Sequence, residues 1–124
     1  MGYRSEVKGL IYGSEQEIKA FKEACYDLYN QVCEDFGENV INEKNKKYSF
    51  ICLNLSYFKW YDEYDEVKHW EQLYDLAQQA GLNTEFTRIG EEWGDIEVDN
   101  GGESCEYYLE VTQKVDSYIH RFND

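Results

Sequence analysis

The chain of 124 residues has no proline, a single methionine and two histidines, and its 12 lysine and arginine residues face 26 aspartate and glutamate residues. The absence of proline excludes proline-rich linkers and recognition tails. No stretch approaches the roughly 18 consecutive apolar residues that a transmembrane helix needs. The first residues contain no apolar signal-peptide core, so we expect a cytoplasmic protein whose four cysteines are reduced thiols.

The scarcity of basic residues also excludes classes of partner. The net charge of −14 makes direct binding to nucleic acid unfavourable, because phosphates are held by clusters of lysine and arginine. Docking on an anionic membrane is unfavourable for the same reason. Because 42% of the residues are hydrophobic and 17% are aromatic, the chain nevertheless has enough apolar surface for a core. We expect residues 1–124 to form a single domain.

Hydrophobic periodicity predicts the order β-α-β-α-β-β-β. An apolar stripe at helical spacing covers residues 15–36, and Ser14 with Glu17 forms a capping box at its start. Residues 38–46 are a polar connection. The predicted strands are 3–12, 48–58, 84–90, 95–99 and 106–112, and the predicted helices are 15–36, 62–80 and a tail to about 122. This order predicts an α+β fold, a two-layer sandwich in which an antiparallel or mixed sheet of about five strands carries two main helices on one face.

Negative charge is concentrated in one part of the sequence. Residues 62–110 hold 15 aspartates and glutamates against two basic residues. Asp95, Glu97 and Asp99 alternate, so a strand would present all three on one face. Three interpretations stay open: a solvated surface, a surface that attracts a basic partner, and a divalent-metal site. The segment lacks the spacing of an EF-hand, so we expect no metal.

Aromatic residues in polar loops complete the candidate surface. Trp70 lies on the apolar stripe of the second helix and is expected in the core, whereas Trp60 and Trp93 lie in loops, where aromatic residues serve either as binding anchors or as plugs over a small core. The candidate partner-binding residues are Trp60, Tyr61, Arg88, Glu91, Glu92, Trp93, Asp95, Glu97 and Asp99.

Motifs for catalysis are lacking. The sequence contains no phosphate-binding loop, no nucleophile elbow, no zinc-protease helix and no zinc-spaced set of cysteine and histidine. His69 and His120 have no catalytic partner that the sequence identifies. We therefore expect no enzyme activity, no catalytic residue and no cofactor.

Several motifs occur together in a known order. The stretches Met1–Val7 (MGYRSEV), Lys59–Tyr61 (KWY), Glu85–Glu92 (EFTRIGEE) and Asp95–Glu97 (DIE) resemble a family of small acidic bacteriophage and prophage proteins. The resemblance implies an accessory protein made in the cytoplasm of a bacterial host, and it carries no catalytic residue over to this chain.

The leading hypothesis is a phage accessory protein that binds and inhibits a basic, nucleic-acid-handling host protein, as an anti-defence factor or a nucleic-acid mimic. One alternative is a protein that binds a signalling nucleotide in a pocket lined by Arg4 and Arg88, since arginine suits phosphate. A second alternative is a toxin-immunity protein. A homodimer also stays open, because small aromatic-rich domains often self-associate.

Overall fold

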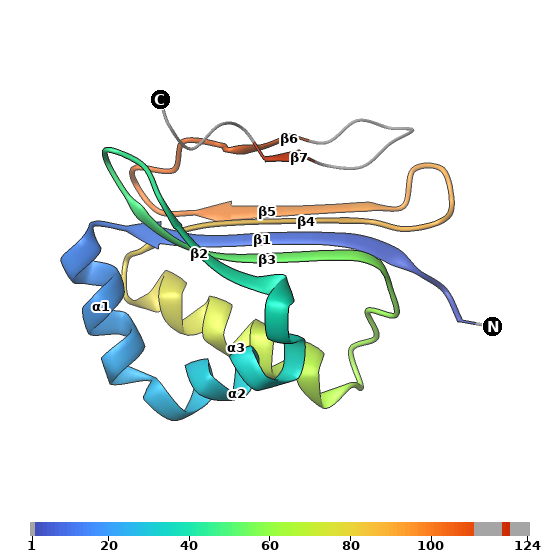
Figure 1. The fold of residues 1–124 in the computed structure, drawn as a ribbon. Coiled ribbons are helices and arrows are strands. Elements are labelled where there is room, and N and C mark those ends of the chain that lie inside the picture. Colours follow the sequence, from blue (N-terminus) through green and yellow to red (C-terminus); the bar gives the residue numbers. More distant parts are fainter. Residues whose placement is uncertain (1, 111–117, 120–124) are drawn as a thin grey trace.

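A five-stranded antiparallel sheet with helices on one face forms the centre of the molecule (Figure 1). The computed structural model describes residues 2–110 and 118–119. The strand order is β2-β3-β1-β4-β5, so β1 is central and β3 has neighbours on both sides. The strands are β1 (Ser5–Gly13), β2 (Val40–Lys44), β3 (Ser49–Phe58), β4 (Asn83–Ile89) and β5 (Ile96–Gly101). The predicted α+β fold is confirmed.

Three α-helices cover one face of the sheet: α1 (Glu15–Ala24), α2 (Tyr26–Phe36) and α3 (Asp65–Gln79). The prediction of one continuous helix over residues 15–36 is wrong, because the backbone leaves helical geometry at Cys25, with φ −121° and ψ 46°. The Cys25 thiol donates to the carbonyl of Phe21, which also accepts the Cys25 N–H. The apolar stripe continues across this break because both helices bury side chains against the same sheet.

Residues 38–46, expected to be a connection, contain a short 3₁₀ helix (Gly37–Asn39) and then β2. This strand escaped prediction because it lies at an edge of the sheet and exposes Ile41 to Lys44, so it has no alternating apolar pattern. The predicted strand 95–99 is also longer than expected, and the chain turns at Gly102, which has φ +97°.

The main core lies between the sheet and the helices. Val7 and Ile11 of β1 pack with Leu53 of β3 and with Trp70 of α3, and all four are almost fully buried. Glycine is required at position 9 of β1, because a Cβ atom there would lie 2.5 Å from Cζ2 of Trp70. The close approach of strand and helix thus depends on this one missing side chain.

A second, smaller core lies on the opposite face of the sheet. Leu10, Tyr12, Phe50 and Cys52 pack there against Tyr108, and all five are buried. The segment 102–110 crosses this face, and β6 (Leu109–Glu110) pairs with β7 (Tyr118–Ile119) in a separate two-stranded sheet above the main one (Figure 1). Residues 109–110 of the strand expected at 106–112 therefore belong to a third layer, and residues 111–112 lie outside the described residues. Residues 118–119 of the expected helical tail form a strand, and the rest of that prediction lies outside the described residues.

Candidate functional site

Two neighbouring hollows lie along strand β5: the first is bounded by the loop before α3 and by the N-terminal segment, and the second is bounded by α3 itself. One has a volume of about 390 Å³ and the other about 380 Å³. They are adjacent along the sheet, because β4 contributes Arg88 to the first and Phe86 to the second, two residues apart. We call the two hollows together the acidic groove. Its lining residues are Tyr3, Trp60, Tyr61, Asp62, Glu63, Trp70, Glu71, Tyr74, Asp75, Gln78, Phe86, Arg88, Asp95, Glu97 and Asp99.

Strands β4 and β5 place the predicted carboxylate row on the helix face of the sheet. Arg88 pairs with Glu97, and Phe86 pairs with Asp99, so these four side chains share one face. Asp95 lies in the turn before β5 and reaches the same arginine. The row that alternation predicts is therefore present, and it forms the β5 side of the groove.

Arg88 neutralises part of this row. One terminal nitrogen lies 2.8 Å from Oδ1 of Asp95, and Nε donates to Glu97. Burial lowers the pKa of Arg88, but the hydrogen bonds to both carboxylates outweigh burial and leave it raised. The same guanidinium, helped by the hydroxyl of Tyr3, lowers the pKa of Asp95. Asp95 is thus held as a carboxylate by groups of the protein itself.

The third member of the row is held by the helix. Oδ2 of Asp99 accepts hydrogen bonds from the hydroxyl of Tyr74 at 2.9 Å and from the amide of Gln78 at 3.1 Å, both on α3. These contacts tie the edge strand β5 to α3. They neutralise no charge, because both donors are uncharged.

The α3 side of the groove carries negative charge without a compensating cation. Burial raises the pKa of Glu71, and the nearby charges of Asp62, Asp75 and Glu97 raise it further. Within the part of the chain that the structure describes, neither Glu71 nor Asp75 has an ion-pair partner. The groove therefore has a net negative potential that the described residues do not relieve.

Aromatic rings form the floor between the two sides. Phe86 lies 5.9 Å from the ring of Trp60 and 6.1 Å from the ring of Tyr74. Trp60 is only 9% exposed and also stacks on Phe36, so it belongs mainly to the core. Trp60 is therefore a plug over the core that also lines the first hollow, and its role in binding stays a prediction. Tyr61 is half-buried, and its hydroxyl accepts the backbone N–H of Tyr3.

The remaining predicted residues lie in the β4–β5 turn and line neither hollow. The carboxylate of Glu91 accepts the backbone N–H of Arg4 at 2.6 Å, and the N–H of Glu92 donates to the hydroxyl of Tyr3. Trp93 is 66% exposed. Glu91 and Glu92 therefore bond to the N-terminal segment that carries Tyr3, a lining residue of the first hollow.

Arg4 and Arg88 do not form a common pocket. The guanidinium of Arg88 contacts the Ser5 hydroxyl on the helix face. The guanidinium of Arg4, just before β1, lies instead over the ring of Tyr57, at 5.1 Å. Arg4 lines neither hollow beside Arg88, so the structure gives the nucleotide-pocket alternative no support.

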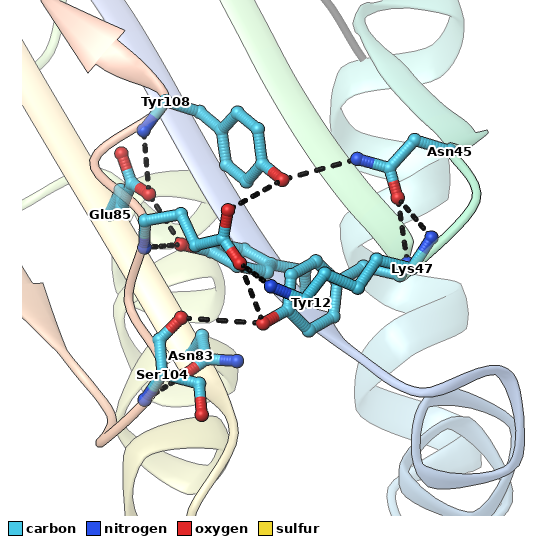
Figure 2. A network of polar contacts seen from close by, with 9 residues as sticks. Tyr12, Asn45, Lys47, Asn83, Glu85, Ser104 and Tyr108 are labelled. Carbon is cyan, nitrogen blue, oxygen red and sulfur yellow. Dashed lines mark hydrogen bonds and ion pairs between the residues drawn. The ribbon is translucent and has the colours of Figure 1, made fainter. Parts of the chain in front are cut away.

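A buried carboxylate on the other face organises the segment 102–110 (Figure 2). Glu85 is 3% exposed and accepts hydrogen bonds from the hydroxyl of Tyr12 at 2.6 Å, from the N–H of Tyr108 at 2.9 Å and from the N–H of Leu109 at 2.8 Å. Burial and this carboxylate raise the pKa of Tyr12. Glu85 falls within the resembling motif, but nothing in the sequence indicates its partners, which lie more than 20 residues away along the chain.

Histidine and cysteine form no recognisable centre in the described residues. Nδ1 of His69 lies 2.7 Å from Asp35, and His120 lies outside the described residues. Among residues 2–110 and 118–119, no group of histidine, cysteine, aspartate and glutamate has the arrangement of a metal site. The helices of the same residues are too short or too polar to cross a membrane.

No protein-family model, no curated protein and no solved structure matches the chain. The resemblance to phage proteins is untested by these comparisons and stays a prediction.

Proposed function

We propose that the protein binds a basic segment of another protein in the acidic groove and so inhibits that protein. The observation that carries this proposal is the composition of the groove, which is lined by seven carboxylates and one guanidinium. A bound lysine or arginine would relieve the repulsion that raises the pKa of Glu71. A unit charge about 4 Å away contributes about 1 kcal/mol even in water, and more where the site is partly desolvated.

The floor of the groove suits the same kind of ligand. Tyr61 is half-buried and lies beside the carboxylates, whereas Tyr74 is 8% exposed and its hydroxyl is bonded to Asp99, so Tyr61 offers most of the ring surface. A guanidinium or ammonium over an aromatic face gains about 0.5–1 kcal/mol at an exposed site, and the aliphatic stem of either side chain packs on apolar surface. A simple metal cation would gain little from these rings.

The finer proposal concerns the identity of the partner. Proteins that handle nucleic acid present basic surfaces to it, and an acidic groove would compete for such a surface and speed the encounter. The resemblance to phage proteins supports a host target of this kind, in the bacterial cytoplasm. A toxin-immunity protein would use the same surface, and the two roles differ only in which basic protein is bound.

The direct test uses a fluorescent peptide of alternating lysine and serine and a charge-matched pair of variants. The double substitution Glu71→Gln with Asp75→Asn removes two charges from the α3 side of the groove without breaking an ion pair. We expect it to weaken peptide binding about tenfold, or about 1.4 kcal/mol. The control, Glu23→Gln with Glu34→Gln, removes two exposed charges from α1 and α2. Equal weakening by both variants would show that only net charge matters and would refute a groove site.

The inhibitory role is tested separately with bacterial lysate. We expect the wild-type protein and the control variant to retain one or more nucleic-acid-binding proteins that the groove variant does not retain. Duplex DNA should release these proteins if the groove occupies their nucleic-acid site. Retention that DNA does not affect would contradict mimicry while leaving the groove as a binding site.

A further inference from the structure

Among the described residues, strand β5 offers both an unpaired backbone edge and the carboxylate row. We propose that the basic segment binds as an additional antiparallel strand along β5, with basic side chains over the groove alternating with apolar side chains on the opposite face. This inference rests on the proposed function and adds the conformation and the sequence pattern of the ligand.

The backbone of β5 has a free side. Among the described residues β5 pairs only with β4, and Glu97 to Asn100 are exposed. The N–H of Gly90 bonds to the carbonyl of Asp95, which therefore points toward β4. The backbone N–H and C=O groups of successive residues point to opposite sides of a strand. Glu97 and Asp99 therefore also direct these groups toward β4, whereas Val98 and Asn100 direct theirs away from β4, to the open edge. Each of the latter two offers one donor and one acceptor to an added strand.

The side chains define what the added strand should carry. Glu97 and Asp99 lie on the helix face, whereas Val98, which pairs with Thr87, lies on the outer face and is 59% exposed. Residues directly opposite each other in neighbouring strands share a face. The complementary strand therefore has lysine or arginine opposite the two acids and an apolar residue opposite the valine.

Charge selects this ligand over a second copy of the chain. Two β5 strands side by side would bring the acids of both copies together, and like charges opposite each other destabilise a sheet. The other edge strand suits a basic segment less well, because the hollow beside β2 is lined by three lysines, Lys19, Lys22 and Lys44, against two glutamates, Glu15 and Glu43. A basic extended segment is thus directed to β5.

Backbone methylation distinguishes strand addition from simple charge attraction. The probe is a fluorescent peptide of alternating lysine and valine, compared with two forms that carry N-methyl groups on either the valines or the lysines. In antiparallel pairing the valines turn their N–H groups toward β5, and the lysines turn theirs to solvent. We expect valine methylation to weaken binding at least tenfold and lysine methylation to weaken it less than threefold.

Substitution of the protein gives a second, independent readout. Val98→Pro removes an outward N–H that bonds to no other strand among the described residues, so this variant should keep the fold but bind the unmethylated peptide more weakly. Val98→Thr keeps the N–H and should bind the peptide as the wild type does. Equal effects of the two methylation patterns, or a stronger effect at lysine, would overturn antiparallel strand addition. If binding in that case still depends on Glu71 and Asp75, the proposed function stands. Failure of the unmethylated peptide to bind at all would overturn both.

Discussion

Substitution of Glu85 tests whether its carboxylate holds the segment 102–110 on the sheet. Glu85→Gln preserves the shape of the side chain but replaces one acceptor oxygen by an NH₂ group. If the NH₂ takes the place of Oε1, the N–H of Leu109 faces a donor; if it takes the place of Oε2, both Tyr12 and Tyr108 lose their acceptor. An unsatisfied buried donor costs about 1–3 kcal/mol, and the remaining bonds lose their ionic character. The neutral amide costs less to bury than a carboxylate, which offsets part of these losses. We therefore expect Glu85→Gln to lower the free energy of unfolding by about 2–4 kcal/mol.

The assay combines urea unfolding with amide hydrogen exchange. Because the contacts of Glu85 are concentrated at one segment, we expect the amides of Tyr108 and Leu109 to lose protection more than the amides of the central strand β1. Glu43→Gln, at an exposed position of β2, removes the same charge and should leave stability almost unchanged. A Glu85→Gln protein as stable as this control, with Leu109 still protected, would refute the proposed role of the carboxylate.

Three further substitutions test the groove and the core. Asp95→Asn should lower the free energy of unfolding by about 1–2 kcal/mol at neutral pH, because Arg88 loses an ionic partner. Since the folded-state pKa of Asp95 is lowered, the difference from wild type in urea unfolding should disappear as the pH falls through that pKa. Glu71→Gln should raise the free energy of unfolding, measured in urea, by about a few tenths of a kcal/mol at neutral pH, because the folded-state pKa of Glu71 is raised. This gain should vanish at pH below the ordinary glutamate pKa, where the wild-type side chain is protonated in both states. Gly9→Ala should lower the melting temperature by forcing a methyl group against Trp70, at a cost of about 1–3 kcal/mol or more; an unchanged melting temperature would show that the ring moves freely.

The main architecture was predictable because its signals are local. The capping box is present as expected, with the Ser14 hydroxyl accepting the N–H of Glu17 and the Glu17 carboxylate accepting the N–H of Ser14. The apolar stripes of the helices and the strong strand at 48–58 also follow from periodicity. The break at Cys25 was not predictable, because the stripe runs on unchanged when two successive helices pack on one sheet.

Features that depend on remote segments were not predictable. Leu10 and Tyr12 are buried by a segment about a hundred residues further along the chain, and nothing near them in the sequence signals it. The carboxylate row followed from simple alternation, but its partial neutralisation depends on the register that places Arg88 beside Glu97. Glu71 was overlooked as a site residue because exposed acids on a helix usually face solvent, and only the position of α3 relative to β5 makes it part of a groove.

The most direct test of the central claim is a titration of the isotope-labelled protein with the lysine–valine peptide, followed by amide chemical shifts in NMR spectra. The proposal predicts that the largest shifts follow β5 and the side of α3 that carries Glu71 and Asp75, and that they weaken as salt is added. Shifts centred on α1 and β2, or shifts spread evenly over all acidic surfaces, would contradict binding in the acidic groove.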